Sequence, residues 1–293
     1  MQAGASLRTR GPLKSKEGII FISAFPLKGN YLQWNVMSSE EKRLFEENYR
    51  EIEPVVQRIS SFLLFGKKID VMGREHFIIR GPSLIVGNHI GSYKDVATIY
   101  KIVPRPVVWT ANRQLFNKIE FKYLVRKHLK RHMKDFGMIA NLILKPISLP
   151  LINYITKNIS RIGTIPVDLS KRKTHAIYSC QENIKRGRTV VLLQGRGRVM
   201  KKDPHPYIHP FRRGAAIISY NIYQETKEAI PVTPVAMFGT HLAGIVPNRI
   251  KVNVGRPMYI SDYQADGFTD TVERFRAALE KRTQRLFYEI VKS

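Results

Sequence analysis

The chain of 293 residues contains a single cysteine, Cys180, and only 23 Asp and Glu against 49 Lys and Arg. One cysteine excludes an internal disulfide and a zinc site built from several thiolates of this chain. The shortage of acidic residues leaves a formal net charge of +26, so the surface attracts anions. Nucleic acid, an anionic membrane and an acidic carrier protein are all candidate partners, and the charge alone does not choose among them.

Long apolar runs are also missing. A membrane-spanning helix needs about 20 apolar residues in succession, and the nearest approach, Phe136 to Ile159, is interrupted by Lys145, two prolines and Asn153. We expect this segment to be interfacial or buried, with a core helix pair broken by proline as the alternative. Residues 1–16 lack the apolar stretch and cleavage site of a secretory signal. The single cysteine fits a protein that faces the cytosol.

What is present is an alternation of short apolar runs and amphipathic stretches. Residues 1–37 mix Gly, Pro and basic residues and are expected to form a basic N-terminal arm. Residues 38–293 are expected to form a single domain. Alternating strands and helices predict an α/β fold with a mostly parallel central sheet flanked by helices, preceded by an N-terminal helical segment. The expected strands are Ile69 to Met72, His76 to Ile79, Leu84 to Val86, Val107 to Thr110, Gly163 to Val167, Thr189 to Leu193, Ile230 to Met237 and Lys251 to Val254. The expected helices are Ser38 to Phe65, Val96 to Ile102, Phe121 to Lys145, Lys173 to Arg186, Arg213 to Tyr223 and Asp270 to Val291.

A helical insertion at about residues 113–160 is expected to be both basic and apolar. Lys and Arg alternate with Phe, Tyr and Leu along Lys118 to Lys134. This pattern is typical of an amphipathic helix on anionic lipid, and a solvated charged face is the alternative. We expect contact with a membrane surface or with an acidic carrier protein. Nucleic acid is not expected as a partner, because no recognised reader motif accompanies the charge.

A histidine and a carboxylate follow one of the apolar runs. Asn88 and His89 come directly after Ser83 to Gly87, and Asp95 lies a few residues further on. A histidine can take a proton from an alcohol, and a carboxylate bonded to its second ring nitrogen fixes the tautomer. The pair is a candidate general base with its orienting partner, and a turn histidine satisfied by a nearby Asp is the simpler alternative.

Three further strand-like segments lie downstream of His89. They are Gly163 to Asp168, Val190 to Arg198 and Ile230 to Met237. The second runs from a strand into a turn rich in Gly and Arg. Glycine lets the backbone approach an anion, and an arginine fork binds phosphate oxygens at two points. This turn is a candidate phosphate-binding site.

With these segments in view, the chain resembles the glycerolipid acyltransferase family, the 1-acylglycerol-3-phosphate and lysophospholipid acyltransferases. Besides the Asn-His and Asp motif, the matching segments are Val71 to Glu75, Gly81 to His89, Phe211 to Ala216 and Gly255 to Pro257. The resemblance covers about Val71 to Ile260.

The resemblance implies an O-acyltransferase for glycerolipid or phospholipid biosynthesis, peripheral or monotopic on the cytoplasmic face of a membrane. His89 would be the general base on the acceptor hydroxyl, and Asp95 would orient it. No covalent acyl-enzyme is required, and neither a metal nor a bound cofactor is expected; acyl-CoA or acyl carrier protein (acyl-ACP) would be the co-substrate. The implied acceptor-phosphate residues are Gln194, Gly195, Arg196, Arg198 and Arg213. The implied motif and acyl-pocket residues are Asn88, Ile165, Pro166, Pro231 and Pro234.

Two positions depart from the family pattern. The family has four residues between His and Asp, whereas five separate His89 from Asp95, and Gly91 is expected to accommodate the additional one. The family's phosphate motif begins Glu-Gly and carries an arginine two residues after the glycine, whereas this chain has Gln194 and Gly197 at those positions. These departures fit a divergent enzyme with a changed acceptor, or a catalytically inactive relative that binds anionic lipid.

Overall fold

The computed structural model describes residues 39–133, 149–168, 174–242 and 247–292. All of them belong to one compact unit, residues 32–293. The predicted basic arm at residues 1–37 and part of the predicted insertion, residues 134–148, lie outside the described residues.

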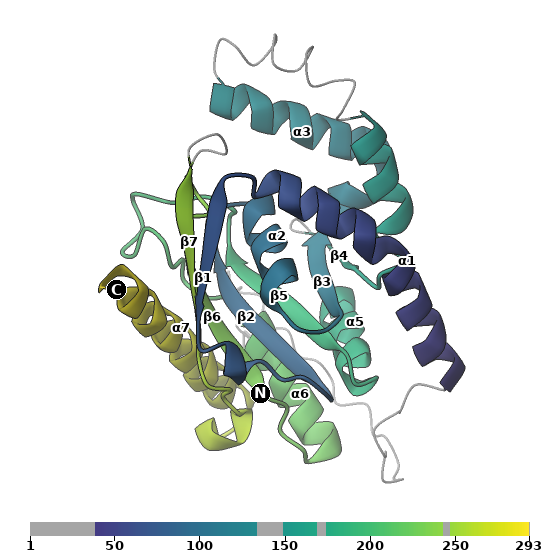
Figure 1. Ribbon diagram of the computed structural model, residues 1–293. Helices are drawn as coiled ribbons and strands as arrows, with labels where there is room; N and C mark the ends of the chain where they lie inside the picture. The colour runs from purple at the N-terminus through teal and green to yellow at the C-terminus, as the bar shows by residue number, and fades with distance from the viewer. Residues whose placement is uncertain (1–38, 134–148, 169–173, 243–246, 293) are drawn as a thin grey trace, which may run out of the picture. The chain divides into compact units, whose positions relative to one another are not determined.

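Seven strands in the described part of the chain form one mixed sheet in the order β1-β7-β6-β2-β5-β3-β4 (Figure 1). β6, β2, β5, β3 and β4 are parallel, whereas β7 runs antiparallel to β6 and pairs in parallel with β1. The predicted mostly parallel α/β fold is therefore confirmed. The strands are β1 (Lys67–Met72), β2 (Ser83–His89), β3 (Val107–Asn112), β4 (Ile165–Val167), β5 (Thr189–Gly195), β6 (Val232–Phe238) and β7 (Asn248–Val254).

Helices cover both faces of this sheet. α1 (Ser39–Leu63), the expected N-terminal helix, packs with α2 on one face, and α5, α6 and α7 lie on the other (Figure 1). The remaining helices are α2 (Tyr93–Ile102), α3 (Lys118–Met133), α5 (Thr174–Lys185), α6 (Gly214–Thr226) and α7 (Phe268–Lys292), with a further helical stretch at residues 149–158 and the 3-10 turns η1 (Arg74–His76), η2 (Arg113–Phe116) and η4 (Ile260–Tyr263).

The continuous apolar run of β2 follows from burial on both faces. Leu84 and Val86 pack into the core beneath α5, α6 and α7, whereas Ile85 packs into the core beneath α1 and α2. Successive side chains of a strand point to opposite faces, so a central strand covered on both sides needs apolar residues at every position. Polar residues appear only at the two ends of the strand, Ser83 at its start and Asn88 and His89 at its carboxyl end.

One predicted strand, His76 to Ile79, is wrong. Gly73 has a left-handed backbone (φ 71°), and the chain turns there into η1. A Cβ at this position would collide with the carbonyl oxygen of Val254, so β1 can turn so close to β7 only with glycine. His76 is held by its Nδ1, which donates to the Val254 carbonyl at 2.8 Å. Ile79 is 66% exposed, so its apolar side chain does not indicate a buried strand.

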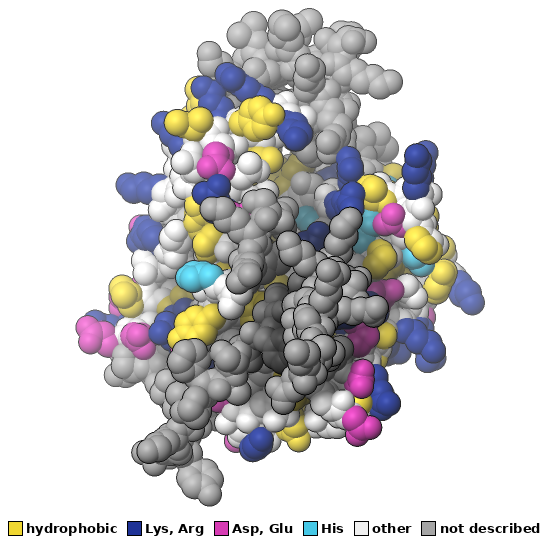
Figure 2. Space-filling view, turned by 180° about the vertical axis from the view of Figure 1, so that it is seen from behind, with side chains coloured by type: hydrophobic (Ala, Val, Ile, Leu, Met, Phe, Trp, Pro, Cys, Tyr) yellow, Lys and Arg dark blue, Asp and Glu magenta, His cyan; other side chains and the backbone are white. Residues whose placement is uncertain are grey.

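α3 presents basic and apolar side chains on one exposed face. Ile119 is 79% exposed and Tyr123 is 61% exposed, and Arg126 and Lys127 are exposed as well. Because spacings of three and four residues share a helix face, these side chains form one stripe. Figure 2 shows Lys and Arg beside hydrophobic side chains at this end of the molecule. None of the helices that the structure describes has the length and apolar character needed to cross a membrane.

Candidate functional site

His89 and Asp95 form a hydrogen-bonded pair at the carboxyl end of β2. His89 is the last residue of this strand, and Asp95 lies in the first turn of α2. His89 Nδ1 lies 2.8 Å from Asp95 Oδ2. The carboxylate is fully buried, whereas a quarter of the His89 side chain is exposed. Nε2 makes no hydrogen bond within the described residues, so it can face a substrate while Nδ1 is held.

Backbone donors fix the Asp95 carboxylate. The amides of Ile90 and Gly91 donate to Oδ2 at 2.9 and 2.7 Å. Since Oδ2 already accepts two N–H groups, the third contact, from His89 Nδ1, is also a donation. The imidazole is therefore held with its proton on Nδ1, and Nε2 is left as the basic nitrogen.

The additional residue between His89 and Asp95 is accommodated at Ser92 rather than at Gly91. Ser92 has φ 54° and ψ −122° and precedes α2, whereas Gly91 is not in the positive-φ region. Gly91 is needed for a different reason: a Cβ there would collide with Thr240. The longer connection thus still brings the carboxylate to the imidazole.

Asn88 positions the end of β2 rather than facing a substrate. It is fully buried, and its amide nitrogen donates to the carbonyls of Tyr207 and Met237 at 3.1 and 3.0 Å. Its carbonyl oxygen accepts the Met237 amide at 2.8 Å. Asn88 therefore ties β2 to β6 and to the loop before α6.

The loop that follows β5 lies directly over the histidine. β5 pairs with β2 in a register that sets Gln194 beside Asn88 and Gly195 beside His89. The Gly197 amide donates to the His89 carbonyl at 3.0 Å. A Cβ on Gly197, which has φ 69°, would lie 3.2 Å from His89 Nε2. The Gly- and Arg-rich turn predicted to bind phosphate is thus at the basic nitrogen.

A second histidine and aspartate, His209 and Asp203, anchor this loop. His209 is buried, and its Nδ1 lies 2.6 Å from Asp203 Oδ2 while Nε2 donates to the Arg198 carbonyl at 3.1 Å. Its ring also packs on Gly195, where a Cβ would lie 2.9 Å from His209 Cδ2. The pair has the same six-residue separation as His89 and Asp95, and that spacing was a signal that sequence reasoning missed.

Replacing His209 with phenylalanine is expected to destabilise the protein. His209→Phe keeps a planar ring but removes both hydrogen bonds, which leaves the Arg198 carbonyl and the Asp203 carboxylate without this donor. We expect a loss of about 1–3 kcal/mol, measured as the free energy of unfolding in denaturant. His175→Phe, at an exposed position of α5, is the control and should change stability much less. Equal effects of the two changes would mean that His209 does not anchor the loop.

Lys94 is a buried cation beside the pair. It is 6% exposed, and its ammonium group donates to the Leu242 carbonyl. Burial lowers the pKa of Lys94, and the positive charge of Lys67 lowers it further, whereas Asp95 opposes both. Lys94 is thus one charge that compensates the buried carboxylate, and no motif pointed to it.

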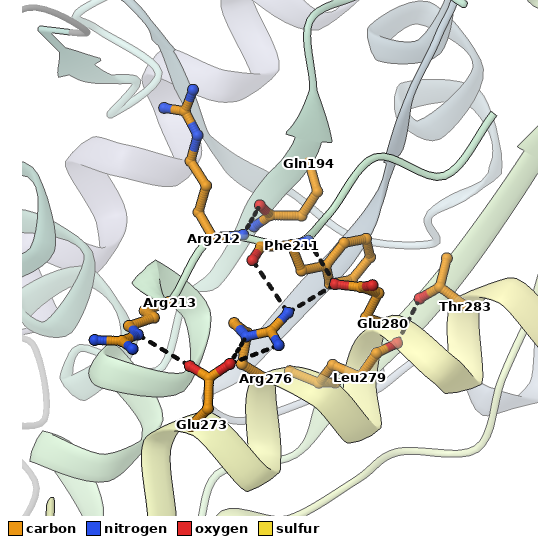
Figure 3. Close-up of polar contacts among 9 residues, drawn as sticks. All are labelled: Gln194, Phe211, Arg212, Arg213, Glu273, Arg276, Leu279, Glu280 and Thr283. Carbon is orange, nitrogen blue, oxygen red and sulfur yellow. Dashed lines mark hydrogen bonds and ion pairs between the residues drawn. The ribbon is translucent and has the colours of Figure 1, made fainter. Parts of the chain in front are cut away.

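Of the remaining predicted residues, Arg213 forms an ion pair with α7 and not with the loop that follows β5. Its guanidinium bonds Glu273 on α7 at 3.0 Å, and Figure 3 shows it directed toward that helix. By contrast, Arg196 and Arg198, on the loop after β5, have no acidic partner among the described residues. The structure therefore brings together His89, Asp95, Gln194, Gly195, Arg196 and Arg198.

The four predicted acyl-pocket residues are not brought to His89. Ile165 and Pro166 belong to β4, which is separated from β2 by β5 and β3. Pro231 precedes β6, and its carbonyl accepts the Leu84 amide at the opposite end of β2. Pro234 is buried within β6 beside Val86.

No protein-family model and no curated protein matches the chain. Among solved structures, it is similar to the crystal structure of the 1-acyl-sn-glycerophosphate (LPA) acyltransferase, PlsC, from Thermotoga maritima, with a TM-score of 0.52 and 17% identity. The similarity covers 86% of this chain and 83% of that chain. At this identity it shows a shared fold: the chain has the α/β architecture of an acyltransferase structure, with a His–Asp pair at the carboxyl end of a central strand.

Proposed function

We propose that the chain is an O-acyltransferase. It moves a fatty acyl group from a thioester donor, acyl-CoA or acyl-ACP, to the hydroxyl of a phosphate-bearing glycerolipid precursor such as 1-acylglycerol-3-phosphate. The observation that carries this proposal is the His89 imidazole. It is held through Nδ1 by buried Asp95, and its Nε2 lies beneath a loop whose arginines have no acidic partner among the described residues.

The arrangement supports direct transfer. His89 Nε2 takes the proton of the acceptor hydroxyl as its oxygen attacks the thioester carbonyl carbon. The tetrahedral intermediate then collapses, the carbon–sulfur bond breaks, and the imidazolium returns the proton to the leaving thiolate. The products are an ester and a free thiol. Asp95 stabilises the imidazolium that forms between the two steps.

The burial of Cys180 argues against an acyl-cysteine intermediate. It is buried between α5 and the sheet at 1% exposure, and burial raises the pKa of its thiol to about 12. A thiol becomes a nucleophile only as the thiolate. Cys180 is therefore not the nucleophile of an acyl-cysteine intermediate, which agrees with direct transfer from donor to acceptor.

The direct test is acyl transfer by the purified protein in detergent or lipid vesicles. Long-chain acyl-CoA and acyl-ACP are each offered with glycerol-3-phosphate, lysophosphatidate and other lysophospholipids, and the release of free thiol is followed together with the acylated lipid. We expect turnover with an acceptor that carries a phosphate. Absence of turnover with every pair would favour an inactive relative that binds anionic lipid.

The same proposal includes docking at the cytoplasmic face of a membrane. α3 follows β3 through η2, so it lies at the carboxyl edge of the parallel strands, the edge that also carries His89. Its exposed stripe combines Ile119 and Tyr123 with Arg126 and Lys127. Apolar side chains that enter the interface beside cations that meet lipid headgroups are typical of peripheral binding.

Charge reversal on α3 is expected to weaken vesicle binding. Arg126→Glu with Lys127→Glu places two negative charges where lipid phosphates would lie, and each basic residue near such a surface contributes about 1 kcal/mol. We therefore expect a loss of at least about thirtyfold in partitioning to vesicles containing phosphatidylserine, measured by sedimentation. The matched control is Arg274→Glu with Lys281→Glu on α7, both exposed. An equal loss in the control would attribute binding to net charge rather than to α3.

A further inference from the structure

Arginines near the candidate site fall into two groups. Arg213 and Arg276 are engaged with acidic residues of α7: Arg213 bonds Glu273, and Arg276 bonds both Glu273 and Glu280. Arg212 is different, since its guanidinium has no acidic partner among the residues that the structure describes, and its side chain is exposed. A free guanidinium beside a paired one is available for an anion.

The backbone of Arg212 is fixed next to the end of β5. Its amide donates to Gln194 Oε1 at 3.1 Å, and Gln194 is itself 6% exposed. The preceding residue, Phe211, is buried, and its amide donates to Glu280 at 2.7 Å. The Cα of Arg212 is thereby anchored between β5 and α7, while its side chain is exposed.

The two neighbouring side chains point in different directions. Figure 3 shows the Arg212 side chain extending away from the Glu273, Arg276 and Glu280 group, while Arg213 turns toward it. Burial raises the pKa of Glu273, but hydrogen bonds from Arg276 and Arg213 outweigh burial and hold the pKa below its usual value. Arg213 is thus committed to a carboxylate, and it would have to leave that carboxylate to bind a ligand.

Gln194 explains how Arg212 is set beside the loop of Arg196 and Arg198. In β5, Gln194 pairs with Asn88, the residue before His89. A glutamine carbonyl oxygen accepts the Arg212 amide without bringing a negative charge to this edge of the sheet. Three guanidinium groups without acidic partners in the described chain, those of Arg196, Arg198 and Arg212, therefore belong to segments that meet at the end of β5.

We propose that Arg212, rather than Arg213, binds the phosphate of the acceptor, together with Arg196 and Arg198. This inference rests on the proposed function, and it makes a phosphomonoester the group that the site selects. Arg212 gives the acceptor two parallel N–H donors, the geometry in which arginine binds phosphate oxygens. Arg213 supports the site by joining the start of α6 to α7.

The test compares Arg212→Gln with Arg213→Gln, and Arg274→Gln on α7 is the control for loss of an exposed positive charge. Two soluble acceptors are used, 1-hexanoylglycerol-3-phosphate and 1-hexanoylglycerol, which differ only in the phosphate. For Arg212→Gln we expect the KM of the phosphate-bearing acceptor to rise about tenfold to hundredfold, the range for losing a charged hydrogen bond. The KM of the donor and that of 1-hexanoylglycerol should change less than about twofold. Arg213→Gln should lower the melting temperature and raise the acceptor KM far less.

Binding without turnover separates this inference from the proposed function. Calorimetric titration with 1-hexanoylglycerol-3-phosphate, in the absence of any donor, should show the same order of affinities: wild type and Arg274→Gln strongest, Arg212→Gln weakest. If the protein binds this probe through Arg212 but never transfers an acyl group, the inference is supported and the proposed function is wrong. No binding by wild type, equal binding by Arg212→Gln, or a larger loss in Arg213→Gln would each overturn the inference.

Discussion

His89→Ala is expected to lower acyl transfer severely while the protein stays folded. The change removes the only group of the pair that can take the acceptor proton, and a positioned general base contributes about a hundredfold to ten-thousandfold in rate. A quarter of the side chain is exposed, so its removal creates a small cavity at most. We expect kcat to fall by that factor, with the protein still folded and the free energy of unfolding lowered by at most about 1–3 kcal/mol, because Asp95 keeps its two backbone donors.

Asp95→Asn is expected to lower acyl transfer less than His89→Ala does. The amide oxygen can occupy the Oδ2 position and still accept from Ile90, Gly91 and His89, and the amide nitrogen then takes the place of Oδ1, which has no partner within the described residues. The tautomer of His89 is kept, but the charge that stabilises the imidazolium is lost. Since charged hydrogen bonds are about twice as strong as neutral ones, we expect a loss of about tenfold to hundredfold.

Rates and folding are measured on the same preparations, by single-turnover release of thiol and by circular dichroism. Turnover that survives His89→Ala in a folded protein would remove His89 from the role of general base. A larger loss in Asp95→Asn than in His89→Ala would mean that the carboxylate does more than orient and stabilise the imidazole.

Gly197→Ala is expected to lower turnover by about a hundredfold, because a displacement of about 1 Å at the reacting groups has an effect of that size. The new methyl group would lie 3.2 Å from His89 Nε2 and 3.3 Å from the Cα of Ser92. It would stand where the acceptor hydroxyl must approach the base. The left-handed backbone at this position (φ 69°) adds strain of about 1 kcal/mol to the loop.

Gly187→Ala is the matched control. Gly187 has nearly the same backbone (φ 74°), but a Cβ there meets nothing within 4 Å. Both changes should cost the free energy of placing a side chain on a left-handed backbone, Gly197→Ala should add the cost of its close contacts, and only Gly197→Ala should lose turnover. Equal activity of the two variants would show that the acceptor reaches Nε2 from a side that Gly197 does not cover.

The sequence was sufficient for the parts of the fold that depend on local pattern. β2 and β6 are apolar runs because both faces of the sheet are covered, and α1 and α7 have periodic apolar faces. The failed strand at His76 to Ile79 shows where the pattern misleads. Its apolar residues follow a left-handed glycine, Gly73, whose close contact with Val254 depends on how β1 and β7 pair.

The candidate site was only partly visible in the sequence. Asn88, His89 and Asp95 could be picked out because they follow a buried strand, and Gly195 to Arg198 because glycine and arginine cluster in a turn. Arg213 was named for the acceptor phosphate and Arg212 was not, although adjacent residues of one type are equivalent in sequence. Glu273, which pairs with Arg213, lies 60 residues further along the chain.

The sequence by itself determined the α/β class, the strand that carries His89 and the residue types available for base and anion chemistry, since each depends on neighbours along the chain. Only the tertiary structure decided that Asp95 reaches His89 across a longer connection, that Gly197 covers Nε2, and which arginines have no carboxylate partner within the described part of the chain. These contacts join segments from separate strands and helices, and their distances are set by strand register and helix packing. No spacing along the chain contains that information.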